Sequence, residues 1–295
     1  MEFVIAMDEL IVCVKQVADP HLVKFDLDKG HVDNVFYILN PPDKAAVEEA
    51  IRIKEKVGGL EVTAITVGPP QADDALRTCL TMGADKAMRV WDSAFDGIDP
   101  FLTGMVLTRV IETLPYKMIF CGAVSADKMD GYLGAAIAES LNLPQVSRVT
   151  KFEISPDQKE VIVHRRLEKG EREVIRCPLP AVFTVDEGLN EPRYSSLPTF
   201  FDGLQKEITI IDPQSLGINF RAQKPTLKVL EMNPPKPRTK KSSSAKIAGL
   251  SGQQKLKALI SGVTKEKKGK VVSETPQGSA TNIVNFMIRE KIFKR

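Results

Sequence analysis

The chain has 295 residues, a hydrophobic fraction of 43% and a formal net charge of +3. This length allows one large domain or two small ones, and the hydrophobic fraction is that of an ordinary globular core. The small net charge and an aromatic content of 6% argue against nucleic-acid binding. No apolar run approaches the length of a membrane span, so none is expected.

The four cysteines are far apart, with no Cys-x-x-Cys pair and no histidine beside them. This spacing excludes the usual zinc and iron–sulfur sites, and we expect no metal. Buried thiols of this kind are typical of a reducing compartment. The first ten residues carry acidic side chains and no basic flank, unlike a secretion or transit peptide. We therefore expect a cytoplasmic protein.

Short apolar runs alternate with amphipathic segments over the first half of the chain. The runs predict strands at residues 10–15, 60–68, 86–91 and 117–122, with short strand-like pieces between 21 and 39. Helices are predicted from residue 41 and at 71–83, 99–114 and 131–144. Gly83 should end the second helix and Asp99 should cap the third. The alternation predicts a doubly wound, mostly parallel sheet that is covered on both faces.

The pattern changes after residue 145. Three strands without intervening helices are predicted at residues 148–154, 160–167 and 172–177, so an antiparallel hairpin is expected. A further core strand is predicted at 179–185, followed by an irregular stretch. The predicted organisation is a nucleotide-binding α/β domain at 1–232 and a linker with a C-terminal arm at 233–295.

The arm is basic and rich in proline and serine at its start, residues 233–246. Two weak helices are predicted within it, near residues 252–261 and 279–293. Ile283, Phe286 and Met287 share one side of the second helix, which predicts that it lies on another surface.

The junction between the first strands and the first helix has an unusual composition. Asn40 is a good N-cap, Pro41 suits the first helical position, and Asp43 favours the positive end of the helix dipole. The pattern is compatible with a simple capped helix and with a helix N-terminus that faces a phosphate.

That helix should have one apolar side. The residues predicted to be buried are Ala46, Val47, Ala50, Ile51 and Ile53. Those predicted to lie on the solvent-exposed side are Lys44, Glu48, Arg52 and Glu55. Glu48 and Arg52 can pair at i, i+4.

A ligand is expected at the carboxyl ends of the parallel strands, beside the point where the strand order reverses. Four segments converge there, namely Cys13, residues 40–43, Val67 with Gly68, and residues 122–137. Glycines in the last segment let backbone amides approach a phosphate. The chain has neither the GxGxxG fingerprint nor a P-loop, and no arrangement of Ser and His residues for catalysis. The residues thus predict a nucleotide-binding domain without catalytic residues of its own.

Several segments together resemble one family. "CVKQVADP", "NPPDKAAVEEAIRIKE", "TVGPPQADDALRTCLTMGADKAMRV" and "LPAVFTVDEGLNEPRYSSLP" match, in order, the beta subunit of electron transfer flavoprotein. The stretch Val163 to Thr184 also matches the family's signature, with departures at Lys169 and Phe183. The resemblance runs from about residue 10 to about residue 235. It implies an α/β fold that is adenine nucleotide alpha-hydrolase-like, with an antiparallel hairpin and a C-terminal arm.

The resemblance implies an electron-carrier subunit and not an enzyme. Its partner would be an alpha subunit, which holds most of the FAD. The beta subunit's own site would bind AMP or, in electron-bifurcating members, a second FAD. Asp43 resembles the bifurcating form, whereas the loop at 127–134 lacks the residues of that form. By position, the implied cofactor-binding residues are Cys13, Asn40, Pro41, Pro42, Asp43, Val67, Ala126, Asp127, Lys128, Met129, Asp130, Gly131, Tyr132, Leu133, Gly134, Ala135, Ala136 and Ile137.

The resemblance also implies two redox partners. These are a flavin-dependent dehydrogenase, such as acyl-CoA dehydrogenase in fatty acid beta-oxidation, and a downstream quinone-linked oxidoreductase. Residues 186–200 resemble the family's recognition loop, in which Leu197 would dock into the dehydrogenase. Pro192 and Pro198 stiffen this loop, so an exposed Leu197 would be preorganised for docking. An ATP-binding regulator related to stress proteins is an alternative, which the spacing of glycines at 122–137 disfavours.

Overall fold

The computed structural model describes residues 8–22, 24–26, 31–33, 35–95, 97–217, 227, 251–253 and 275–289. The chain divides into two compact units, Met1–Pro234 and Pro235–Arg295. The predicted linker at 233–246 and most of the predicted helix near 252–261 lie outside the described residues.

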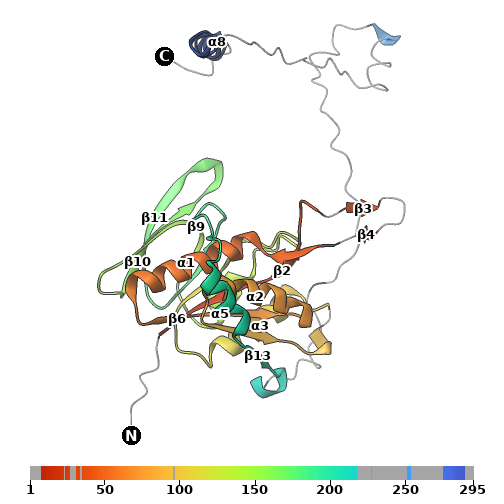
Figure 1. The fold of residues 1–295 in the computed structure, drawn as a ribbon, viewed down its shortest axis with the longest axis vertical. Coiled ribbons are helices and arrows are strands. Elements are labelled where there is room, and N and C mark those ends of the chain that lie inside the picture. Colours follow the sequence, from red (N-terminus) through yellow and green to blue (C-terminus); the bar gives the residue numbers. More distant parts are fainter. Residues whose placement is uncertain are drawn as a thin grey trace. The chain divides into compact units, whose positions relative to one another are not determined.

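The first unit is built on a nine-stranded sheet with the strand order β11-β10-β9-β12-β8-β1-β6-β7-β13 (Figure 1). Its neighbouring strands are parallel except at β9–β10 and β10–β11. The strands are β1 Asp8–Cys13, β6 Leu60–Val67, β7 Lys86–Val90, β8 Tyr116–Gly122, β9 Gln145–Ile154, β10 Glu160–Arg166, β11 Arg172–Pro178, β12 Ala181–Val185 and β13 Ile208–Ile211. The predicted mostly parallel sheet with an antiparallel hairpin is thus confirmed.

Two short antiparallel ribbons precede the first helix. One pairs β2 (Gln16–Ala18) with β5 (Tyr37–Leu39), and the other pairs β3 (Lys24–Asp26) with β4 (His31–Asp33). The strand-like pieces predicted around a turn are therefore present.

Helices connect the parallel strands as predicted. Their bounds are α1 Pro41–Val57, α2 Asp73–Met82, α3 Pro100–Ile111, α4 Leu133–Ser140, α5 Leu197–Gln205 and α8 Pro276–Arg289, with 3₁₀ turns at Pro70–Ala72, Ser93–Phe95, Glu168–Gly170 and Pro213–Leu216. Asp99 caps α3 by accepting a hydrogen bond from the N–H of Leu102 at 2.9 Å. Gly83 ends α2 with φ of 124°, as predicted. No helix among the described residues is long and apolar enough to cross a membrane.

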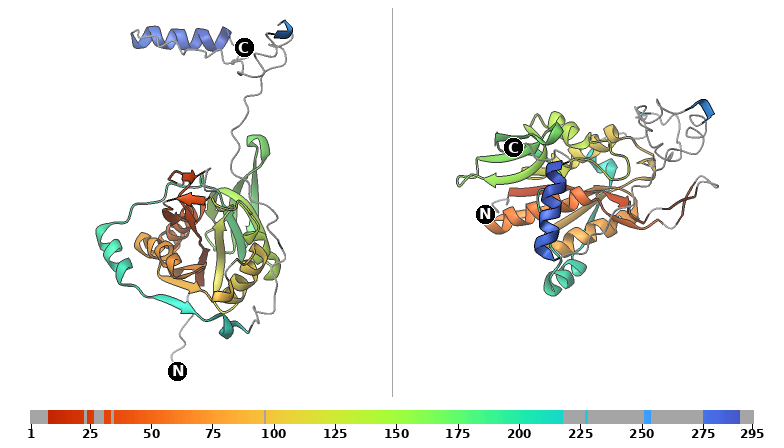
Figure 2. Two further views of the ribbon diagram at one scale, coloured as in Figure 1. Left: turned by 90° about the vertical axis from the view of Figure 1, so that its right-hand side faces the viewer. Right: turned by 90° about the horizontal axis from the view of Figure 1, so that it is seen from above.

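The alternation of side chains along β1 separates two apolar cores. Leu10 and Val12 point into a core with residues of α1 and α2, whereas Ile11 and Cys13 join a core with residues of α3 and α4. Successive residues of a strand face opposite sides of a sheet, so a fully buried strand must be apolar throughout. Figure 2 shows α1 and α2 on one side of the sheet and α3 and α4 on the other.

The strand order reverses between β1 and β8. From β1 the chain adds β6 and β7 on one side, and it then returns to place β8 on the other side of β1. Loops that follow these two central strands separate at this point, which is where open α/β sheets bind ligands.

The stretch after residue 186 is more regular than the sequence analysis predicted. It contains α5 and the edge strand β13, which pairs with β7 in parallel. Ser196 caps α5, and its side chain accepts from the N–H of Thr199 at 3.4 Å. Gly203 lets α5 approach α2 closely, because a Cβ at this position would lie 2.6 Å from the backbone of Leu80.

This close approach gives a first prediction. Gly203→Ala should lower the free energy of unfolding by about 1–3 kcal/mol, because backbone must move to admit the methyl group. Urea unfolding followed by circular dichroism measures the change. Gly188→Ala is the control, since nothing lies within 4 Å of a Cβ there. Equal stabilities of the two variants would contradict the close packing of α5 on α2.

Candidate functional site

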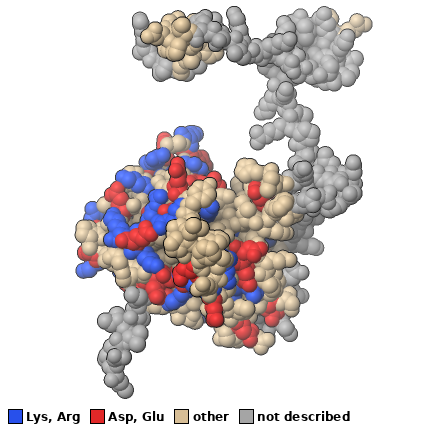
Figure 3. Space-filling model, viewed as in Figure 1, with Lys and Arg blue, Asp and Glu red and all other residues tan. Residues whose placement is uncertain are grey.

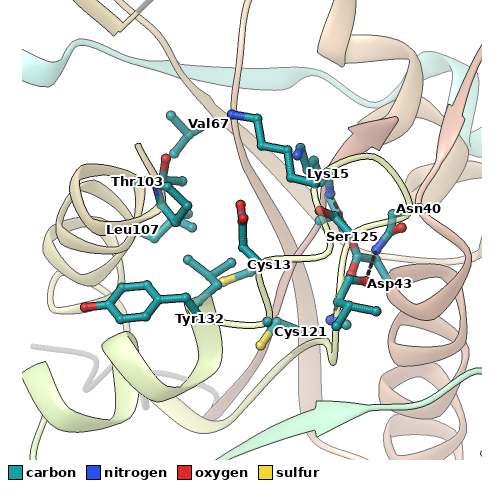
Figure 4. A pocket seen from close by; sticks show the side chains of 18 of the residues that line it. Cys13, Lys15, Asn40, Asp43, Val67, Thr103, Leu107, Cys121, Ser125 and Tyr132 are labelled. Atoms are coloured by element: carbon teal, nitrogen blue, oxygen red, sulfur yellow. Dashed lines mark hydrogen bonds between the residues drawn. The ribbon is translucent and has the colours of Figure 1, made fainter. Parts of the chain in front are cut away.

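A cavity of about 270 Å³ opens at the carboxyl edge of the sheet, beside the reversal of strand order. The ends of four parallel strands contribute to it, through Cys13 of β1, Val67 of β6, Trp91 after β7 and Gly122 of β8. Figure 4 shows Thr103, Leu107 and Tyr132 on one side and Lys15, Asn40, Asp43 and Ser125 on the other. The cavity therefore has an apolar wall and a polar wall.

Asp43 ties the two central strands together at the polar wall. Its Oδ2 accepts a hydrogen bond from the N–H of Lys15 at 2.8 Å, directly after β1. Its Oδ1 accepts from the N–H of Gly122 at 2.8 Å, at the end of β8. Gly122 is required for this contact, because a Cβ there would lie 2.2 Å from Oδ1 of Asp43.

Asn40 fixes the loop after β8 and does not cap α1. Its Oδ1 accepts from the N–H of Ala126 at 3.0 Å, and its Nδ2 donates to the carbonyl of Val124 at 3.1 Å. The predicted side-chain cap is wrong, since no cap hydrogen bond forms. The prolines at positions 41 and 42 carry no N–H, so the first turn of α1 has few donors to satisfy. The Asn40 amide is consequently available to the loop.

The titratable groups at the base of the cavity are shifted by burial. Burial raises the pKa of Asp43 to about 7, although hydrogen bonds from Asn40, Lys15 and Gly122 act in the opposite direction. Burial, together with the nearby Asp43 charge, raises the pKa of the Cys13 thiol to about 12. Burial also raises the pKa of Cys121. Both thiols are thus protonated at neutral pH and are poor nucleophiles.

The rim of the cavity carries charges of both signs. Lys15 Nζ lies 2.6 Å from a carboxylate oxygen of Asp127, which joins the loop after β1 to the loop after β8. Lys128 and Asp130 also line the cavity. The charges are close to balance, so a ligand with one phosphate group suits this rim better than one with several.

The N-terminus of α4 faces the same region. α4 begins at Leu133, a lining residue, and has no side-chain cap. Gly134 allows the helix to pack directly on β12, because a Cβ there would lie 2.3 Å from Cγ2 of Thr184. Helix N-termini of this kind bind anions through free amides.

The structure brings half of the predicted site residues to the cavity. Those that line it are Cys13, Asn40, Asp43, Val67, Lys128, Asp130, Gly131, Tyr132 and Leu133. The remainder are not among the lining residues: Pro41 and Pro42 in the first turn of α1, Ala126, Asp127 and Met129 in the loop, and Gly134, Ala135, Ala136 and Ile137 in α4. Ile137 is fully buried in the apolar core.

The sequence analysis missed one part of the apolar wall of the cavity. This part consists of residues after β7 and in α3, among them Trp91, Phe95, Ile98, Thr103 and Leu107. It also missed Lys15 on the polar wall, whereas Ser125 belongs to the predicted segment 122–137. The position of Trp91 at the end of a predicted strand was the available signal, since all parallel strands end at this edge.

A second feature is the predicted recognition loop, which ion pairs attach to α1. Arg193 donates from Nε to Oε2 of Glu48 at 2.8 Å and from Nη2 to Oε1 at 3.2 Å. It also reaches Glu55 at 2.9 Å. Asn190 donates to the carbonyl of Ala45 at 3.0 Å. These contacts fix the loop to α1.

Glu48 was predicted to lie on the solvent-exposed side of α1, and this prediction is wrong. The residue is 1% exposed because Arg193 covers it, while the predicted pair with Arg52 is present at 2.7 Å. Burial opposes ionisation, but hydrogen bonds from Arg193 and Arg52 outweigh it and lower the pKa of Glu48. Leu197 is 73% exposed and is the first residue of α5.

A doubly wound sheet with a cavity at its reversal point is the arrangement in which open α/β proteins bind their ligands. A family model of the electron transfer flavoprotein domain matches residues 32–215. A beta subunit of electron transfer flavoprotein from Thermoanaerobacterium thermosaccharolyticum is 42% identical over 213 residues, which cover 71% of this chain and 80% of that protein. The chain belongs to the electron transfer flavoprotein beta-subunit family, which confirms the resemblance.

Two further relatives have other names. The CarD subunit of the caffeyl-CoA reductase-Etf complex from Acetobacterium woodii is 38% identical over 213 residues, 71% of this chain and 80% of that protein. Protein FixA from Azotobacter vinelandii is 36% identical over 244 residues, 79% of this chain and 86% of that protein. The family's role is electron transfer, as its name states.

The buried Asp43 predicts a pH dependence of stability. Its pKa is about 7 in the folded chain and 3.8 in the unfolded chain, so between about pH 4 and 7 the folded chain holds the extra proton. The free energy of unfolding should therefore fall by about 1 kcal/mol per pH unit across this window. Urea unfolding at several pH values measures the slope.

Asp43→Asn is the matched variant for this test. It should be less stable at every pH, because its amide group must face one of the two backbone donors. It should also lack the slope that Asp43 contributes. Identical slopes in the two proteins would contradict a raised pKa of Asp43.

The ion pairs of the recognition loop give a further prediction. Arg193→Ala leaves the buried Glu48 with Arg52 alone and should cost about 2 kcal/mol of stability. It should also speed chymotrypsin cleavage after Tyr194, an exposed residue of the loop that the substitution leaves in place. Arg109→Ala is the control, because Arg109 forms an exposed pair with Glu112 and should cost less than about 0.5 kcal/mol. Equal cleavage in both variants would show that the loop has another support.

Proposed function

We propose that this chain is the beta subunit of a heterodimeric electron transfer flavoprotein. It pairs with an alpha subunit that holds most of the FAD, and it shapes one side of that flavin site. Membership of the family supports this assignment. The described residues include no group of His, Cys, Asp and Glu that could hold a metal ion. An electron carrier needs no acid, base or nucleophile of its own, which agrees with protonated, buried thiols at the cavity.

We further propose that the cavity binds an adenine nucleotide, and AMP first of all. Val67, Ile98 and Leu107 lie at the apolar wall and would contact the base. Ser125, Lys128 and the N-terminus of α4 would meet the phosphate. The observation that carries the proposal is the joint fixing of both loops by Asp43 and Asn40, which shapes one cavity from two strand ends.

AMP suits this cavity better than a second FAD. The cavity has a volume of about 270 Å³, which is at the lower limit for ligand pockets. The balanced charge at the rim also favours one phosphate over two. The second FAD remains the alternative because Asp43 stands where the bifurcating form of the family has its aspartate.

Electrons would pass between a flavin-dependent dehydrogenase, such as acyl-CoA dehydrogenase, and a downstream quinone-linked oxidoreductase. Leu197 would dock the dehydrogenase. It is exposed, it lies at the end of a loop that Arg193 and Asn190 hold, and it needs little ordering on binding. Tyr194, 98% exposed, adds a large contact area beside it.

Counting nucleotides tests the proposal. The chain is co-expressed with an alpha subunit, and nucleotides are extracted from the purified pair. One FAD and one AMP per pair is the expected result. Two FAD and no AMP would replace AMP with the bifurcating alternative. A pair without flavin would overturn the function.

Asn40→Ala tests the role of the loop. It removes both bonds to residues 124 and 126, so we expect the pair to lose most of its AMP and keep its FAD. Ser196→Ala is the control. It removes the side-chain cap of α5, which should lower the free energy of unfolding by about 1 kcal/mol, and Ser196 does not line the cavity. If both variants retain AMP equally, Asn40 does not shape the nucleotide site.

A further inference from the structure

Charge is divided unevenly between the two units. Residues 235–295 carry 15 Lys and Arg against 3 Asp and Glu, a net charge of +12. Residues 1–234 carry 26 against 35, a net charge of −9. On the face shown in Figure 3, cationic and anionic side chains of the first unit are interspersed. The small net charge of the whole chain therefore conceals a strongly basic arm, which an anionic surface would attract.

The helix α8 within this arm has an exposed apolar side. Ile283, Val284 and Ile288 are 60%, 49% and 59% exposed. The pair Val284 and Ile288 is spaced i, i+4, so both side chains lie on one side of the helix. Asn282 and Asn285 lie along the other side. Residues 275–288 contain no charged side chain.

Cations follow this apolar helix directly. The last seven residues of the chain contain four of them, at positions 289, 291, 294 and 295, and one acid, Glu290. An apolar helix side combined with a cluster of Lys and Arg is the pattern of helices that lie in a membrane interface. A nucleic acid or an acidic protein would attract the Lys and Arg residues, but it would not bury the isoleucine side chains. With 14 residues, α8 is also too short to span a bilayer.

We propose that the C-terminal arm binds the surface of membranes that contain anionic lipids. α8 lies in the interface with Ile283, Val284 and Ile288 inserted, and the net charge of +12 on residues 235–295 attracts the arm to the anionic surface. Two weak signals are combined here, since apolar insertion and a polybasic segment each give only marginal binding alone. The proposal does not depend on which nucleotide the first unit binds.

Vesicle co-sedimentation of the full-length protein tests this proposal. Vesicles of equal parts phosphatidylglycerol and phosphatidylcholine should bind the protein, and vesicles of phosphatidylcholine alone should not. Ile283→Asp with Ile288→Asp should weaken binding at least about tenfold more than Asn282→Asp with Asn285→Asp. The two double variants carry the same charge change on opposite sides of α8, so their difference reports insertion of the apolar side.

Five results would overturn the proposal. Four of them concern binding: no binding to anionic vesicles, equal losses in the two double variants, unchanged binding by a chain that ends at Pro234, and tighter binding to a single-stranded RNA than to the vesicles. A melting temperature lowered only in the isoleucine variant would also overturn it. That result would show that this side of α8 is already covered by protein.

Discussion

The site depends on one carboxylate that holds two strand ends together. β1 and β8 are neighbours in the sheet, but the loops that follow them separate at the reversal of strand order. Asp43 accepts one backbone N–H from each loop. Its burial makes ionisation costly, and its raised pKa records that cost. The carboxylate therefore contributes geometry to the cavity at the expense of stability near neutral pH.

Other local choices in the sequence follow from this arrangement. Gly122 is needed because any side chain there would collide with the carboxylate. The prolines at positions 41 and 42 start a helix that requires no side-chain cap, which leaves Asn40 for the loop after β8. The junction at residues 40–43 resembles a capping motif, but its side chains hold the loops after β1 and β8 in place.

Sequence reasoning predicted the sheet, the helices between parallel strands, the hairpin and the edge on which the cavity lies, because each follows from local periodicity and chain order. It failed where a residue's role depends on distant partners. Asn40 was expected to cap its own helix, and Glu48 was expected outside because Arg193 lies 145 residues away. Trp91 and Phe95 were missed because apolar residues after a strand look like ordinary core. α5 was missed because its first residues, Leu197 and Pro198, follow an irregular stretch.

The ion pair between Arg193 and Glu48 suggests what is gained by burying charge beside a docking loop. A buried pair contributes little net stability, because desolvation of both groups offsets their attraction. Its directional hydrogen bonds nevertheless define one position of the loop relative to α1. A loop that is already ordered loses less entropy on binding, so Leu197 can remain exposed without a flexible support. The same logic applies to Asp43, whose buried charge orders the cavity before any nucleotide arrives. In both places a buried carboxylate fixes the position of a loop, and the result is a surface or cavity whose shape exists before its partner binds.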